Sequence, residues 1–338
     1  MLAVILSVSG LKGFPLWIAG GCLLAFVSAF SPWFLHSSME KIVETDELGF
    51  GHFGGFGYWV SAQCGKLFAK KADESTEDIN FPQRLTFLRD STVSIGITMM
   101  VFFLVVTGVA VGKGILNADP ADFANLGELL VAGETTTHWA VFAIKSGLNF
   151  AGAVYVILSG VRLVVSEIVP AFRGIAEKLV PGAVPAIDCP VVFPYAPNAV
   201  LIGFLVSFVG GVVGLLVLMG VNASIAPVAL ILPGVVPHFF CGASAGVFGN
   251  AEGGWRGCVL GSFVHGLLIT FLPAIVMPVF TNMGFTSATF SDADFSWMAL
   301  VFGNLSLSVG AMIMLVISVV VFLAPIVLSA VIPAKKEA

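Results

Sequence analysis

Asp188 is the residue in this chain that is best placed to do chemistry. It lies in Pro181–Asn198, PGAVPAIDCPVVFPYAPN, which holds five prolines and a single acid. Each proline removes a backbone donor and resists a regular helix. A carboxylate in apolar surroundings costs about 2.5–3.5 kcal/mol on the insertion scale, so it usually faces a bundle interior or a substrate path. We therefore expect a binding site here, with Tyr195 and Asn198 as flanking donors.

Two histidines are further candidates. His52 lies in Gly49–Tyr58, GFGHFGGFGY, which contains a GxGxxG string. No strand–helix unit surrounds that string, so we do not interpret it as a dinucleotide site. A histidine can donate or accept near neutral pH, although most loop histidines are merely solvated. His238 is a possible second polar site, but a packed helix residue is the commoner role. Asp188 could instead cap the apolar run that begins at Ala199, although it lies far upstream of it.

The composition excludes a soluble protein. The chain has 338 residues, of which 58% are hydrophobic and 10% charged. Soluble domains carry about 25% charged residues. The few, scattered basic residues exclude nucleic-acid binding. The five cysteines show no CxxC pair or metal-ligand spacing, so we predict no disulfide, metal site or cofactor.

The apolar runs predict an all-α polytopic membrane protein with about seven to eight transmembrane helices. The runs are 14–35, 93–111, 138–165, 199–221, 258–280 and 309–332. Pro and Gly residues interrupt a further apolar segment within 226–257. Interrupted segments of this kind often form transporter binding sites. The sequence leaves open whether this segment or the proline-rich stretch also crosses.

The charged loops indicate the orientation. Residues 36–91 hold six of the fifteen basic residues, which places this loop and its amphipathic helix in the cytoplasm. Within it, Ala72–Asp78 is expected to be solvated. Residues 166–180 have an apolar stripe and are expected to form an interfacial helix, which leads into the substrate-site hairpin ending at Asn198. Lysines near the end predict a cytoplasmic C-terminus.

Several stretches, in order along the chain, resemble a known family. They are Gly49–Trp59, Lys70–Pro82, Phe87–Ile95, Arg162–Pro190, Asp188–Phe204 and Pro233–Gly257. The resemblance is to the ascorbate-type enzyme IIC (UlaA/SgaT family), the membrane permease of the bacterial phosphoenolpyruvate-dependent phosphotransferase system. It implies a homodimer in the inner membrane, re-entrant hairpins that hold a sugar acid, and an elevator-type movement. It also implies soluble IIA and IIB partners, with the phosphoryl donor cysteine on IIB and no catalytic residue here.

The resemblance assigns substrate contacts to His52 and Asp188. Phe53 stands where a glutamine follows the histidine in well-known members, so the hydroxyls that can be bound differ. The family also has further N-terminal membrane segments, and Met1 falls just after them. We therefore expect residues 1–338 to be one membrane domain that is incomplete at its N-terminus.

Two functions remain open from the sequence, beside a third interpretation in which the chain is a non-functional fragment that survives only as a packed bundle. The first is a group-translocating permease for ascorbate or a related sugar acid, in which Asp188 could also accept a proton from the substrate. The alternative is an ion- or proton-coupled secondary transporter that uses Asp188 and Lys145 as a relay.

Overall fold

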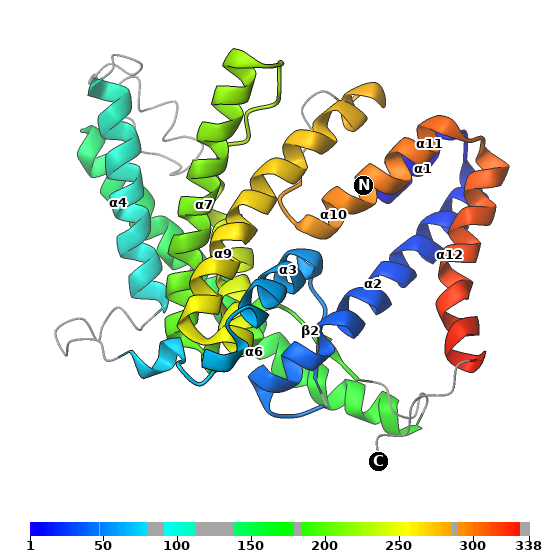
Figure 1. Cartoon of the computed structure of the whole chain (residues 1–338), viewed down its shortest axis with the longest axis horizontal. Coiled ribbons are helices and arrows are strands. Elements are labelled where there is room, and N and C mark those ends of the chain that lie inside the picture. The colour runs from blue at the N-terminus through cyan, green and yellow to red at the C-terminus, as the bar shows by residue number, and fades with distance from the viewer. Residues whose placement is uncertain (47, 80–90, 113–137, 179–183, 286–289, 332–338) are drawn as a thin grey trace. The chain divides into compact units, whose positions relative to one another are not determined.

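The structure is a computed structural model that describes residues 1–46, 48–79, 91–112, 138–178, 184–285 and 290–331. Within these ranges it is helical apart from one pair of two-residue strands, which confirms the predicted all-α class (Figure 1). The chain forms two compact units. The first unit is Met1–Asp78 with Val180–Ala338, and the second is Ile79–Leu179. Arg84, Arg89 and the C-terminal lysines, on which part of the orientation depends, lie outside the described residues.

In the first unit, helices from both ends of the chain share an apolar core. Helices α1 (Leu2–Val8), α2 (Gly13–Val43) and α12 (Ala311–Val331) pack together. Buried side chains of this core include Ile5, Leu23, Phe280, Phe302 and Met314.

The helix α2 extends beyond its predicted end at Leu35 to Val43, so the polar loop begins later than predicted. The reason is a buried polar contact on its last two turns. The Ser38 hydroxyl and the Lys41 ammonium each donate to the Glu252 carboxylate, at 2.7 Å. Glu252 is only 3% exposed, and a buried carboxylate is stable only when it is paired in this way.

Glycines allow α7 (Pro197–Ser224) and α9 (Ala243–Asn282) to pack at close range. A Cβ atom on Gly203 would lie 2.7 Å from the Gly242 carbonyl oxygen, and one on Gly246 would lie 2.6 Å from that of Ala199. Both distances are below van der Waals contact. Small residues at helix interfaces have this role in membrane proteins.

The interrupted segment before α9 is non-helical at first and then runs directly into that helix. Residues 226–234 are non-helical, and α8 (Val235–Pro237) then leads into η6 (His238–Gly242), a π-helical turn. π-helical turns occur frequently at functional sites. The glycines near the end of the interrupted 226–257 segment form a break inside α9, where Gly254 has a φ of 61°.

Strands β1 (Gly49–Phe50) and β2 (Ala186–Ile187) join two distant loops of the first unit. They pair in parallel, with Gly49 opposite Ala186 and Phe50 opposite Ile187. The Gly49 and Gly51 N–H groups donate to the carbonyl oxygens of Pro185 and Ile187, both at 2.9 Å. After β2 the proline-rich stretch forms two short 3₁₀ helices, η4 (Cys189–Val191) and η5 (Phe193–Tyr195), and then enters α7. Helix α3 (Gly55–Lys66) follows β1 and packs on α9.

The second unit contains two described helices, α4 (Ser91–Gly112) and α6 (Trp139–Lys178), which pack on each other. Helix α6 continues through Pro170, so the separate interfacial helix predicted from residue 166 is the C-terminal part of α6. Lys145, proposed as a relay residue in the alternative function, also lies in α6.

Among the described residues, four helices are long and apolar enough to cross a membrane. They are Gly13–Val43, Trp139–Ile157, Pro197–Ser224 and Val235–Asn282. Two shorter apolar helices, Gly96–Val109 and Ala311–Val327, cover the other predicted runs. The chain is therefore a multi-pass membrane protein.

The strand pairing yields a test with a matched control. A Cβ atom on Gly51 would lie 2.8 Å from the Ala186 Cβ, whereas one on Gly49 would have nothing nearer than 3.7 Å. Overpacking of this kind costs about 1–3 kcal/mol. We expect Gly51→Ala to open the pairing and to accelerate hydrogen–deuterium exchange of peptides covering 49–52 and 185–187. Gly49→Ala should exchange like the wild type; equal exchange in both variants would contradict the pairing.

Candidate functional site

The strand pairing brings the two candidate ligand residues together. His52 follows β1 by two positions and Asp188 follows β2 directly, so the parallel register carries both side chains to the same end. The His52 Nε2 lies 3.9 Å from the Asp188 Oδ1. The side chain of His52 is 21% exposed and that of Asp188 is 57% exposed. One wall of the pair is therefore open to a ligand.

Asp188 is a helix cap, but not of the helix considered in the sequence analysis. Its Oδ1 accepts a hydrogen bond of 2.7 Å from the Cys189 N–H, at the start of η4. The N-terminus of α7 is capped instead by Glu77, whose carboxylate accepts from the N–H groups of Asn198 and Ala199 at 2.9 and 3.1 Å. The second oxygen of Asp188 keeps its capacity to accept from a ligand.

His52 is held in place through its Nδ1 atom. The Gly54 N–H donates to Nδ1 at 3.0 Å, and the Tyr58 hydroxyl lies 2.7 Å from the same atom. An Nδ1 that accepts carries no proton, so the neutral ring has its proton on Nε2. Tyr58 is fully buried and stacks on the rings of Phe248 and His265.

The charge of His52 depends on opposing influences. Burial disfavours the imidazolium and lowers the pKa of His52. Neighbouring Cys189, Asp292 and Asp188 act in the opposite direction, and the balance raises this pKa to about 9. The imidazolium must give up the bond from Gly54, because a protonated Nδ1 cannot accept. In either state Nε2 carries a hydrogen, so it can donate to an oxygen of a ligand.

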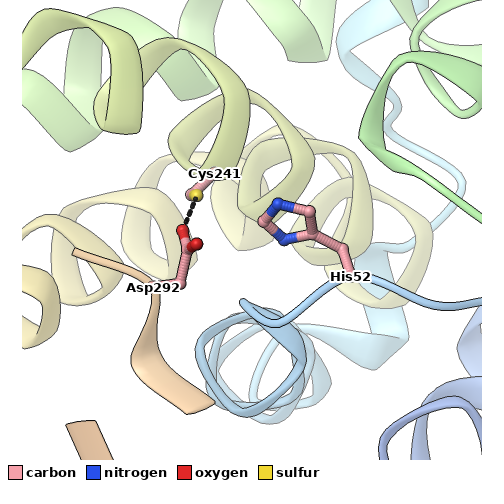
Figure 2. Close-up of side chains that lie close together, drawn as sticks. All are labelled: His52, Cys241 and Asp292. Atoms are coloured by element: carbon pink, nitrogen blue, oxygen red, sulfur yellow. Dashed lines mark hydrogen bonds between the residues drawn. The ribbon is translucent and has the colours of Figure 1, made fainter. Parts of the chain in front are cut away.

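Two further polar side chains lie close to His52 (Figure 2). One is Cys241, which belongs to η6, and the other is Asp292, which directly precedes α10 (Ala293–Met298). The Cys241 thiol donates to the Asp292 Oδ1 at 3.1 Å. Ligand atoms of these two residues and of His52 lie within 4.8 Å of one another. Sequence reasoning missed both residues, because neither lies in a local motif with His52.

The side chain of Phe53 points into an apolar cluster. Its ring stacks on Phe295 with centroids 4.9 Å apart, and its carbonyl oxygen accepts from the Asp294 N–H. The Asp294 carboxylate in turn accepts from the N–H groups of Gly55 and Phe56, at 3.1 and 2.9 Å. These bonds anchor the start of α3 directly after His52. Burial raises the pKa of Asp294 to about 6, although its hydrogen bonds act to lower it.

The other predicted neighbours of Asp188 have different roles. Asn198 is buried, and its side chain donates to the Thr76 carbonyl oxygen at 2.9 Å, so it holds the 72–78 segment onto α7. That segment is thus packed at Thr76 rather than fully solvated. Tyr195 is 48% exposed.

His238 is buried against α7 rather than placed at Asp188. Its Nδ1 lies 2.9 Å from the Ser207 hydroxyl, which also lies 3.2 Å from the His265 Nδ1. His238 lines a separate cavity of about 240 Å³, together with Pro233, Thr270 and Ser291.

Comparison with known proteins decides the family. Residues 1–294 match the family described as EIIC-GAT, PTS system sugar-specific permease component. The chain belongs to this family. The match confirms the resemblance found in the sequence, and the long apolar helices agree with a multi-pass membrane protein.

A curated relative adds detail. The chain is 28% identical over 255 residues to the ascorbate-specific PTS system EIIC component of Mycoplasma pneumoniae. The alignment covers 72% of this chain and 38% of the relative. The chain therefore spans well under two thirds of the length of the curated relative it matches.

The anchor at Asp294 can be tested by stability. Asp294→Ala would leave the Phe56 N–H and the Trp297 indole N–H without an acceptor, whereas the Gly55 N–H keeps the His52 carbonyl oxygen. Each orphaned buried group costs about 1–3 kcal/mol. We expect a lower unfolding midpoint for the detergent-solubilised protein. Asp46→Ala, at an exposed acid in the loop before β1, should match the wild type. Equal midpoints for both variants would show that this cap contributes nothing.

Proposed function

We propose that this chain is the IIC permease of a phosphotransferase system that takes up ascorbate or a related sugar acid, with His52 and Asp188 as its substrate contacts. The observation that carries the proposal is the pairing of these two residues at 3.9 Å in a chain of the sugar-permease family. The name of the curated relative supports the choice of ascorbate.

The chemistry of the pair suits a polyhydroxylated ligand. Asp188 can accept from substrate hydroxyls with its free oxygen, and His52 can donate through Nε2–H. A site that hydrogen-bonds a substrate hydroxyl strongly rejects analogues without that hydroxyl, because the site's buried polar groups are then left unpaired. His52, in its cationic form, would also offset the negative charge of a sugar acid near the two carboxylates.

Asp188 is also placed to assist phosphoryl transfer. In this proposal the substrate hydroxyl oxygen attacks phosphorus of a phosphocysteine on the IIB partner. The S–P bond breaks, the thiolate remains on IIB, and the hydroxyl proton passes to Asp188. The half-exposed carboxylate of Asp188 is accessible enough for this step. The chain itself mainly positions its substrate.

The wider arrangement is part of the same proposal. It comprises a homodimer in the bacterial inner membrane, a cytoplasmic C-terminus, IIA and IIB partners, and elevator-type movement of the substrate site. The family and the basic residues of the 36–91 loop support it. Phe53 offers no amide to a substrate hydroxyl and packs on Phe295, so a related sugar acid stays in the proposal beside ascorbate.

The decisive experiment is uptake of labelled ascorbate and related sugar acids into membrane vesicles, with and without phosphoenolpyruvate and the soluble phosphotransferase proteins. The protein should be expressed with any coding sequence upstream of Met1. We expect phosphorylated product only with phosphoenolpyruvate. Accumulation of unmodified substrate that a protonophore abolishes would instead establish secondary transport.

In the same vesicles, Asp188→Asn tests the site. A hydrogen bond to a charged group contributes about 1.5–3 kcal/mol, so we expect uptake to fall at least about tenfold with normal amounts of protein in the membrane. Asp46→Asn is the matched control and should transport normally. Wild-type uptake by Asp188→Asn would refute the assignment.

A further inference from the structure

We propose that His52, Cys241 and Asp292 form a binding site for a zinc-class divalent metal ion. An imidazole, a thiol and a carboxylate converge from three separate parts of the first unit, and one ligand atom from each lies within 4.8 Å of the others (Figure 2).

The three ligand types select the class of ion. Imidazole nitrogen, thiolate sulfur and carboxylate oxygen are the ligands that Zn²⁺ takes, at about 2.0–2.3 Å. A tetrahedral ion with such bonds needs neighbouring ligand atoms about 3.3–3.8 Å apart. The Cys241 sulfur and the Asp292 oxygen are already 3.1 Å apart. Hard ions such as Mg²⁺ and Ca²⁺ prefer oxygen ligands alone, so the thiol disfavours them.

Each ligand is anchored by its own element. His52 lies between β1 and α3, whose first N–H groups are held by Asp294. Asp292 is only two residues before that anchor. Cys241 belongs to the π-helical turn η6 and is 2% exposed. The site is thus assembled by the fold itself, so little ordering is needed on binding.

Metal binding would displace a proton from the site. In this structure the Cys241 thiol donates a hydrogen bond to the Asp292 carboxylate. On binding, the metal takes the place of this proton, which leaves to solvent, and the thiolate and carboxylate both become ligands. With metal on Nε2, the His52 Nδ1–H would give up the bond from the Gly54 N–H and donate to the Tyr58 oxygen 2.7 Å away, the kind of partner that orients a metal-bound histidine.

Three protein ligands leave a fourth position open. Asp188 and Cys189 are also close to His52, because ligand atoms of these three residues lie within 4.8 Å of one another. Asp188 or Cys189 can therefore approach the fourth position. If the proposed function holds, His52 is shared, and metal and sugar acid would compete for it. The metal site itself does not depend on the identity of the transported solute.

Cobalt binding tests the inference on the purified full chain in detergent. Co²⁺ replaces Zn²⁺ and gives a thiolate-to-metal charge-transfer band only when a cysteine is a ligand. We expect one Co²⁺ per chain with this band, displaced by Zn²⁺. Cys241→Ser should lose the band. Asp292→Asn should weaken Zn²⁺ binding at least about tenfold, since even an outer hydrogen-bond partner contributes 10–100-fold.

Cys258→Ser is the matched control, because Cys258 is equally buried but its sulfur contacts the Ala199 carbonyl oxygen instead. It should bind like the wild type, and each variant is checked for an unchanged unfolding midpoint. A band that survives in Cys241→Ser and vanishes in Cys189→Ser would overturn the assignment, as would absence of Co²⁺ binding in the wild type. Loss of uptake with intact Co²⁺ binding, or the reverse, would separate this inference from the proposed function.

Discussion

The parallel pairing of β1 with β2 is the contact on which the candidate site depends. It consists of two residue pairs, yet it joins loops that lie far apart in the chain and gives His52 and Asp188 a common direction. Gly51 is part of the constraint, because a side chain there would collide with Ala186. Backbone hydrogen bonds fix this register more tightly than two flexible side chains could. The side chains of His52 and Asp188 are therefore left free for a ligand.

Buried acids hold the surrounding loops. Asp294 caps α3, Glu77 caps α7, and Glu252 binds the end of α2. Each carboxylate accepts hydrogen bonds from groups distant in sequence, so each one links two separate segments of the chain. The glycine contacts between α7 and α9 provide the rigid base on which these links act. Apolar packing and carboxylate hydrogen bonds therefore have separate roles, the first for the bundle and the second for its loops.

The sequence predicted the long apolar helices, and the two residues that it singled out, His52 and Asp188, lie 3.9 Å apart. Long apolar runs have few alternatives to a membrane helix, and an acid among prolines in apolar surroundings stands out by its cost. Cys241, Asp292 and Asp294 could not be found in this way, because their significance comes from tertiary contacts with the 52–56 segment. The end of α2 was misjudged for the same reason, since the contact between Lys41 and Glu252 is visible only in the folded chain. Asn198 was assigned to Asp188 by proximity in sequence, whereas it binds Thr76.

The order in which these contacts can form has a consequence for biosynthesis. His52 leaves the ribosome early, but its partners come from residues 186–189, 241 and 292–294. Until the last of these is inserted, the Phe56 N–H lacks its acceptor and one side of the histidine loop has no neighbour. A chain released before residue 294 would lack both Asp294 and α12, which packs on α2, so premature termination would leave the pocket unassembled and the apolar core of the first unit incomplete.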